Sequence, residues 1–163
     1  MNAKVLRQLI DGGETLSVEF KGEENRLLSD AELLEAVVCL ANRPGNESGW
    51  LLVGVEDDRR VTGARLRRGR NVLEPRKIQA LIANRTRPSL TCDVEVIEYQ
   101  GKPVLAIRVP SSPVPVGTAD SKYSRRIIGG LGKPECVPYH FFEMVARQAD
   151  VGMGDYTALP IPE

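Results

Sequence analysis

A short apolar run in the middle of the chain constrains the fold more than any other feature. Residues 50–55 read WLLVGV and contain no charged side chain. Six residues are enough for a strand that is covered on both faces, but far fewer than the roughly 18 to 20 apolar residues of a membrane helix. The run therefore predicts a buried central strand, and it requires other elements to pack on each side of that strand.

Sequence signals on both sides of this run alternate between helix and strand. The stretch GETLSVEFK alternates apolar Leu16, Val18 and Phe20 with polar residues, which is the period of a half-buried strand. Ser29 followed three residues later by Glu32 forms a capping box, so we expect a largely buried helix to begin there. The chain thus offers both kinds of element that a layered domain needs.

The expected elements follow one another without an internal repeat. In chain order they are a helix at 3–11, a strand at 16–21, a helix from Ser29 to Pro44, the strand at 50–55, a helix at 75–85, a hairpin of strands 93–99 and 103–109, a strand at 122–128 and a helix at 139–149. This order predicts an α+β fold in which helices flank a mixed β-sheet. Residues 1–150 are expected to form one domain. Residues 151–163 show no periodicity and are expected to be a linker towards a further C-terminal region.

The cysteines limit the metal and redox chemistry that we expect. Cys39, Cys92 and Cys136 lie far apart in a chain with one histidine, His140. This spacing excludes a zinc knuckle and argues against a disulfide framework, so we expect a cytoplasmic protein in a reducing compartment. Any bound metal would have to be held by oxygen ligands. No membrane partner is expected.

The net charge of zero hides two oppositely charged segments. Residues 1–58 carry 5 Lys/Arg and 12 Asp/Glu, a balance of −7, whereas residues 59–87 carry 10 Lys/Arg and a single acid, Glu74, a balance of +9. Arginine dominates the basic segment, and the guanidinium group matches the geometry of phosphate. The pattern is that of a phosphate-backbone binder, but a solvated loop and a charged helix face would give the same pattern.

Three acidic residues at the predicted strands form a candidate metal site. Glu14 and Glu19 belong to GETLSVEFK, and Asp57 follows the apolar strand. Carboxylates at neighbouring strand ends suit Mg²⁺ or Mn²⁺, which could activate water against a phosphate. Glu14 can join Glu19 only if the chain bends between them. In the alternative, Glu14 ends a turn and Glu19 pairs with an arginine on a neighbouring element.

The order of several motifs resembles one known family. The chain contains GETLSVEFK, LLEAVVCLAN, GWLLVGVEDD followed by VTGA, GKPVLAIRVPSSPVPV and KYSRRIIG. In this order the motifs resemble the Schlafen AlbA-type domain, over about residues 10–150. The loop from Asn42 to Gly49 is longer than the family's Asn-x-x-Gly-Gly, and GLGKPE replaces a short serine-containing turn. Both departures affect contacts made by loops rather than the fold.

The resemblance implies a fold and two activities. It implies an α+β fold around a mixed sheet, and bacterial members are described as DNA-binding or transcriptional-regulator domains, often at the N-terminus of helicase-related proteins. A similar domain of vertebrate Schlafens cleaves transfer and ribosomal RNA with three carboxylates and a divalent metal. Carried over by motif, those carboxylates fall on Glu14, Glu19 and Asp57. The zinc site of the vertebrate proteins has no counterpart among the scattered cysteines.

Three functions are therefore expected, in order of preference. The first is DNA binding in a bacterial transcriptional regulator, and the second is a Mg²⁺- or Mn²⁺-dependent ribonuclease acting on structured RNA. The third is a sensory or oligomerisation module, which leaves association with further copies of the chain open. The residues expected to contact DNA or RNA phosphates are Arg59, Arg60, Arg67, Arg68, Arg70, Lys77, Arg85, Arg87, Arg125 and Arg126.

Overall fold

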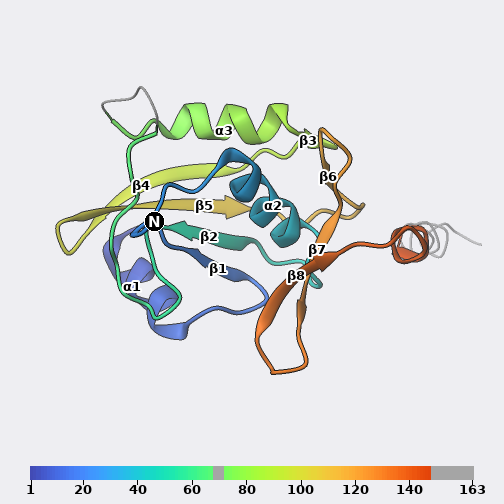
Figure 1. Cartoon of the computed structure of the whole chain (residues 1–163), viewed down its shortest axis with the longest axis horizontal. Coiled ribbons are helices and arrows are strands. Elements are labelled where there is room, and N and C mark those ends of the chain that lie inside the picture. Colours follow the sequence, from blue (N-terminus) through green and yellow to red (C-terminus); the bar gives the residue numbers. More distant parts are fainter. Residues whose placement is uncertain (68–71, 148–163) are drawn as a thin grey trace, which may run out of the picture.

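A four-stranded mixed sheet forms the centre of the molecule (Figure 1). The computed structural model describes residues 1–67 and 72–147. The sheet has the order β1 (Val18–Lys21), β2 (Gly49–Val53), β5 (Lys102–Val109) and β4 (Asp93–Tyr99). β1 runs parallel to β2, and the other two pairs are antiparallel. With its helices, this arrangement confirms the predicted α+β fold.

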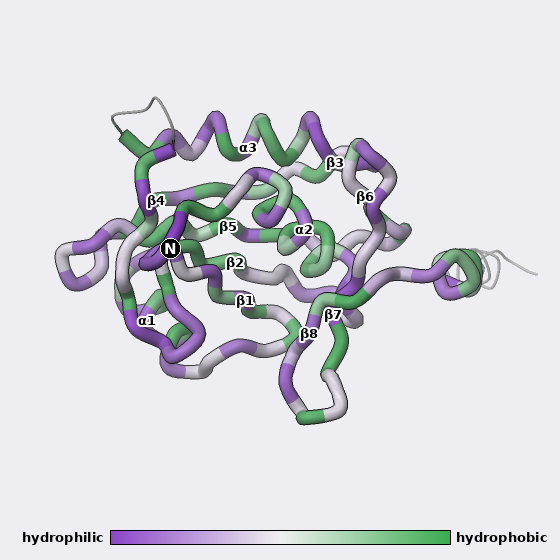
Figure 2. Tube along the Cα trace, viewed as in Figure 1, coloured by the Kyte–Doolittle hydropathy of each residue, from purple (hydrophilic) through white to green (hydrophobic). Residues whose placement is uncertain are grey.

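Helices cover both faces of the sheet, as the apolar run requires. The three main helices are α1 (Ala3–Gly12), α2 (Asp30–Ala41) and α3 (Pro75–Asn84). α2 and α3 pack with Leu51 and Val53 on one face, whereas α1 packs with Phe20 and Leu52 on the other. Figure 2 shows apolar segments along α2, β2 and β5. Because neighbours in β2 point to opposite faces, a strand between two helical layers must be apolar at every position.

The local signals of the sequence place most elements correctly. The Ser29 hydroxyl accepts a hydrogen bond from the Glu32 amide (3.1 Å), so the predicted N-cap of α2 is confirmed. The β4–β5 hairpin turns through two residues, Gln100 and Gly101, which both have positive φ. The turn is therefore one residue shorter than predicted, because Lys102 already belongs to β5.

The apolar run leaves the sheet earlier than its composition suggests. β2 ends at Val53, and Gly54 adopts a φ of 101°. Its carbonyl accepts hydrogen bonds from the amides of Thr62 (2.9 Å) and Gly63 (3.0 Å), and a Cβ at Gly54 would collide with the backbone of Gly63 and Ala64. The chain's own return loop therefore needs a glycine at this position.

A second hairpin lies beside α2 and carries elements that the sequence predicted only in part. β7 (Ser124–Ile128) lies within the strand predicted at 122–128, and it pairs with β8 (Pro134–Pro138), which was not predicted. The short strands β3 (Thr86–Arg87) and β6 (Gly117–Thr118) pair with each other and were also missed. Residues 141–147 are helical, so the predicted helix begins two residues later than expected; its last two residues and the predicted linker lie outside the described residues.

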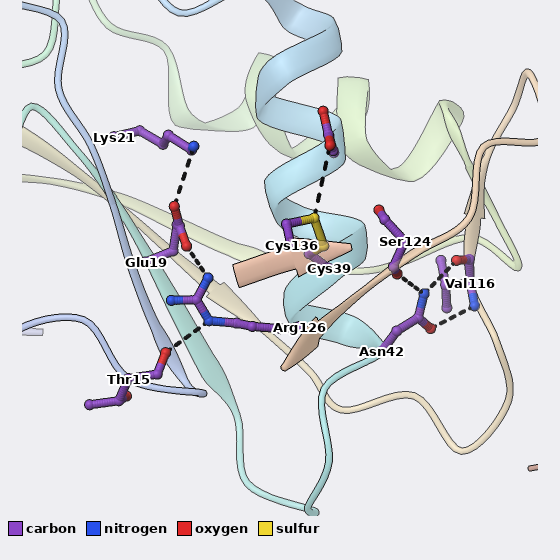
Figure 3. The surroundings of a disulfide bond; sticks show 10 residues. Thr15, Glu19, Lys21, Cys39, Asn42, Val116, Ser124, Arg126 and Cys136 are labelled. Carbon is purple, nitrogen blue, oxygen red and sulfur yellow. Dashed lines mark hydrogen bonds and ion pairs between the residues drawn. A yellow bond between two sulfur atoms is a disulfide. The ribbon is translucent and has the colours of Figure 1, made fainter. Parts of the chain in front are cut away.

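A disulfide joins this hairpin to α2, which corrects the expectation for the cysteines. Cys39 of α2 and Cys136 of β8 are bonded across 5.9 Å between their Cα atoms (Figure 3). Cys92 is free and buried. The prediction that the chain forms no disulfide was wrong because residues 97 positions apart in sequence meet through the unpredicted strand β8. The spacing of the cysteines therefore no longer supports a reducing compartment. None of the described helices is long and apolar enough to cross a membrane.

Candidate functional site

The chain bends between Glu14 and Glu19, as a shared acidic site requires. Thr15 and Val18 exchange backbone hydrogen bonds of 3.0 and 3.3 Å, which close a tight turn after Gly13. Glu14 thereby returns alongside the free edge of β1, where its Oε1 accepts a hydrogen bond from the Phe20 amide (2.9 Å). An unpaired amide of an edge strand needs such an acceptor. The strand predicted at 16–21 begins only at Val18 for the same reason.

Glu19 pairs with an arginine from the β7–β8 hairpin. The guanidinium of Arg126 donates to Glu19 Oε2 through Nη1, and to the carbonyl oxygens of Thr15 and Val18 at 2.8 Å (Figure 3). Arg126 is only 1% exposed. Lys21 Nζ lies 3.3 Å from the other carboxylate oxygen of Glu19. The alternative expected from the sequence, an arginine partner for Glu19 on a neighbouring element, is therefore what the structure shows.

The three acids lie within electrostatic range of one another. Burial raises the pKa of Glu14, and the negative charges of Glu19 and Asp57 raise it further. The hydrogen bond from Phe20 and the charge of Arg126 act in the opposite direction. The charge of Glu14 is therefore coupled to those of the other two carboxylates of the predicted site.

These carboxylates do not fit a divalent metal in the arrangement described here. Both oxygens of Glu19 face cations, and Glu14 already accepts a backbone amide. Among residues 1–67 and 72–147, no group of three or more acidic, histidine or cysteine side chains is arranged to hold a metal ion. A hard cation needs several free oxygens at about 2.0 to 2.6 Å, and the bound arginine and lysine compete for them. We therefore derive no metal-dependent step.

Substituting Glu14 with glutamine is expected to stabilise the fold at pH 7. Because the folded protein holds the Glu14 proton to a higher pH than the unfolded chain, the free energy of unfolding falls as pH rises from about 4.5 through the raised pKa. Glutamine keeps an acceptor for the Phe20 amide and removes the charge. Urea unfolding should show the gain at pH 7 and none at pH 4 or below.

The same substitution at an exposed glutamate gives the matched control. Glu98→Gln in β4 should change the unfolding free energy little at either pH, because Glu98 is exposed. An equal gain at both pH values in Glu14→Gln, or a loss at pH 7, would contradict the electrostatic account of Glu14.

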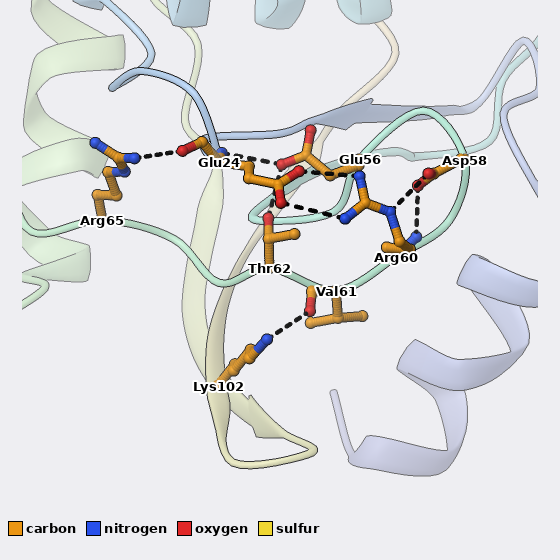
Figure 4. Close-up of polar contacts among 8 residues, drawn as sticks. All are labelled: Glu24, Glu56, Asp58, Arg60, Val61, Thr62, Arg65 and Lys102. Atoms are coloured by element: carbon orange, nitrogen blue, oxygen red, sulfur yellow. Dashed lines mark hydrogen bonds and ion pairs between the residues drawn. The ribbon is translucent and has the colours of Figure 1, made fainter.

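The first part of the basic segment folds back onto the acidic segment. Arg60 donates to Asp58 (2.7 Å) and to Glu24 (2.9 Å), and these carboxylates raise the pKa of the guanidinium (Figure 4). Arg67 Nη1 lies 2.6 Å from the buried carboxylate of Glu23. Arg60 and Arg67 of the basic segment therefore pair with acids of the acidic segment within the fold.

The other arginines of this part bind backbone oxygens. Arg59 donates to the Asp11 carbonyl (2.8 Å), and Arg65 donates to the Glu24 carbonyl. Arg68 and Arg70 lie outside the described residues. The cations of residues 59–67 thus bind groups of the chain itself, and hold the return loop to the end of α1 and to the segment that follows β1.

The second part of the basic segment faces solvent. Arg76, Lys77, Arg85 and Arg87 are exposed on and just after α3, and we call these four residues the α3 ridge. Lys77 lies 3.0 Å from Glu74, and Arg87 donates to the carbonyls of Asn84 and Thr86. Within the described ranges, no ion pair joins Arg76, Arg85 or Arg87 to an acid. The ridge is therefore the part of the basic segment that keeps its positive charge at the surface.

Comparison with known proteins establishes the family. The family model described as Schlafen, AlbA_2 matches residues 14–130. The chain belongs to this family. The match begins at Glu14 and contains Glu19, Asp57 and the whole basic segment, so the resemblance seen in the motifs is confirmed.

A solved structure shares the fold of this Schlafen, AlbA_2 chain. The DIP2311 protein from Corynebacterium diphtheriae superposes with a TM-score of 0.63 at 24% identity, over 88% of this chain and 27% of that chain. This chain therefore spans about a quarter of the length of that protein. The N-terminal domain of a RecG-related ATP-dependent DNA helicase protein from Nitrosomonas europaea gives a TM-score of 0.48 at 22% identity, over 69% of this chain and 74% of that domain. The comparison with curated proteins gave no match.

Two arginines that were not among the predicted phosphate contacts lie in a cleft. Arg43 and Arg147 line a cleft at the C-terminal end of α2, next to Arg125 of β7. Arg43 lies just before Pro44 in what the sequence presents as a helix end, and Arg147 lies in a helix that carries no motif. Their sequence neighbours gave no signal, because the cleft assembles from four segments distant in the chain.

Proposed function

We propose that this chain is a DNA-binding domain of a bacterial transcriptional regulator or helicase-related protein. Membership of the Schlafen, AlbA_2 family supports a nucleic-acid-associated domain. The observation that carries the proposal is the α3 ridge, where Arg76, Arg85 and Arg87 are exposed and form no ion pair within the described ranges, whereas Arg60 and Arg67 pair with acids of the chain itself. Phosphate contacts of this kind position a protein on DNA without reading its sequence.

The geometry of α3 suits a phosphate backbone. The helix has 10 residues and is therefore about 15 Å long. One strand of duplex DNA presents a phosphate about every 3.4 Å along the axis of the duplex. A protein helix of this length that lies along that axis therefore spans about four phosphates. Ala80 and Asn84 lie on the same exposed side as Arg76, and their small side chains allow close approach. No aromatic side chain interleaves with the ridge, so the proposal favours duplex DNA over stacked single strands.

Removing two ridge arginines is expected to weaken DNA binding and its salt dependence. The double variant Arg76→Gln/Arg85→Gln should lower the slope of log K against log salt by about 2, since each lost phosphate contact removes about 0.9. A gel-shift titration of duplex DNA at several salt concentrations measures both quantities. The wild-type protein and the double variant should both show only a weak preference for DNA sequence.

Arg60→Gln is the matched control for this experiment. Arg60 is also exposed and basic, but its guanidinium is held by Glu24 and Asp58. The Arg60→Gln variant should leave the slope of log K against log salt unchanged. If the double variant binds DNA with wild-type affinity and slope, or if the wild type is not retained at low salt, the ridge is not a DNA interface.

A metal-dependent ribonuclease is the second candidate, because Glu14 lies in the electrostatic range of Glu19 and Asp57. It ranks second because Arg126 and Lys21 hold Glu19. Incubating the protein with transfer RNA and Mn²⁺ separates the two proposals. We expect binding without cleavage, whereas cleavage that is lost in Asp57→Asn with binding kept would favour the enzyme.

A further inference from the structure

A cleft between α2, β7 and the helical residues 141–147 lies apart from the acids and from the α3 ridge. Its volume is about 800 Å³, within the range of small-molecule sites. None of its lining residues belongs to the acidic cluster or to α3. The polar residues that line it are Asn42, Arg43, Asn46, Ser111, Ser112, Arg125, Tyr139, Glu143 and Arg147.

Two guanidinium groups in this cleft have buried nitrogens without a partner. Arg43 is 1% exposed, and its Nη1 donates to the Leu40 carbonyl while its Nη2 has no hydrogen-bond partner among the described residues. Arg125 Nη2 pairs with Glu143 at 2.5 Å, but its Nε is likewise buried and unpartnered. A buried donor without an acceptor costs about 1 to 3 kcal/mol, and more when the group is charged.

Arg147 adds a third cation and fixes the shape of the cleft. Its Nη1 donates to the Asn42 carbonyl (3.3 Å) and the Tyr139 hydroxyl (3.4 Å), and its Nη2 donates to the Ser112 carbonyl. Neutral oxygens thus orient this guanidinium, and within residues 1–67 and 72–147 it forms no ion pair.

Among the described residues that line the cleft, three arginines face one acid, which leaves an excess of two positive charges. The three arginines are opposed by Glu143 within the lining, and Glu47 acts on Arg43 from outside it. Burial holds the pKa of Arg43 below its usual range, with Glu47 opposing this effect. A phosphate monoester carries about −1.5 to −2 charges near pH 7 and offers three strong acceptor oxygens.

We propose that this cleft binds a phosphomonoester, with Arg43, Arg125 and Arg147 as its cationic ligands. The excess charge and the two unpartnered donors match a terminal phosphoryl group. The group can come from a free mononucleotide or from the 5′ end of a nucleic acid. This site does not depend on the α3 ridge, and duplex binding is expected to survive its removal.

Calorimetric titration of the full chain with adenosine 5′-monophosphate, inorganic phosphate and adenosine tests the proposal. The two phosphates should bind and adenosine should not. Arg125→Gln and Arg147→Gln should each weaken binding by about tenfold, which corresponds to the loss of one charged hydrogen bond. Arg7→Gln, an equivalent change at an exposed arginine of α1, should leave binding unchanged. Thermal unfolding of each variant verifies that it is folded.

Competition with oligonucleotides identifies the source of the phosphoryl group. Displacement of the mononucleotide by a 5′-phosphorylated strand, but not by its 5′-hydroxyl twin, supports a nucleic-acid end. Displacement by neither supports a free phosphorylated compound. Equal displacement by both strands, binding of adenosine as tight as that of its monophosphate, or wild-type affinity in both arginine variants would overturn the proposal.

Discussion

Replacing Arg126 with methionine is expected to lower the free energy of unfolding by about 3 to 5 kcal/mol, the range for breaking a buried ion pair from one side. Methionine fills similar space but cannot donate to Glu19 or to the carbonyls of Thr15 and Val18. The Glu19 side chain, which is 15% exposed, would keep only Lys21 as an ionic partner. Urea unfolding followed by circular dichroism measures the change.

Arg125, the neighbour of Arg126 in β7, offers a control with the same chemical change. Arg125→Met removes an arginine from the same strand, but the side chains of Arg125 and Glu143 are about one-third exposed. Partly exposed pairs contribute little, so this variant should lose about 1 kcal/mol or less. Equal losses in the two variants would show that the Arg126 network does not hold the hairpin to β1.

This network shows why the sequence identified Glu19 correctly but not its partner. Alternation in GETLSVEFK places Glu19 on the polar side of β1, and local pattern is sufficient for that. Its partner Arg126 lies 107 residues away, and nothing in the spacing of KYSRRIIG distinguishes Arg126 from Arg125. Arg126 turns into the protein and Arg125 faces a cleft, because neighbours in a strand point to opposite sides.

The basic segment illustrates a second limit of sequence reasoning. A count of charges treats Arg60 and Arg85 alike, although Asp58, one of the partners of Arg60, stands two residues before it. In the fold, the return loop after Gly54 brings Arg60 and Arg67 to Glu24 and Glu23. The sequence predicts that the opposite charges exist, but only the tertiary structure determines which of them meet.

The helices and the central strand were predictable for a different reason. Ser29 and Pro75 mark helix starts through hydrogen bonding and fixed φ within a few residues, and an uninterrupted apolar run requires cover on two faces. β8 was missed because prolines flank its short span, Pro134–Pro138. The missed disulfide follows directly from that error, since Cys136 reaches α2 only through β8.

Reducing the Cys39–Cys136 bond is expected to lower the free energy of unfolding by about 4 to 5 kcal/mol. The bond closes a loop of 97 residues, and loop-closure entropy assigns about 4.7 kcal/mol to a loop of about 100 residues. The open chain gains conformations mainly in the unfolded state, so the native fold should persist at a lower urea midpoint. Unfolding curves with and without dithiothreitol measure the shift.

The Cys136→Ser variant and the buried free thiol of Cys92 make this test specific to the disulfide. Cys136 is exposed and accepts serine without burying a new polar group, so the variant should reproduce the reduced midpoint and respond no further to dithiothreitol. Burial raises the pKa of Cys92 to about 12, which keeps that thiol protonated and unreactive towards the disulfide in the folded protein. The loss therefore belongs to the Cys39–Cys136 bond alone. An unchanged midpoint after reduction would mean that the β7–β8 hairpin is held in place by the contacts of Arg126 with β1 and of Asn42 at the end of α2, without help from the disulfide.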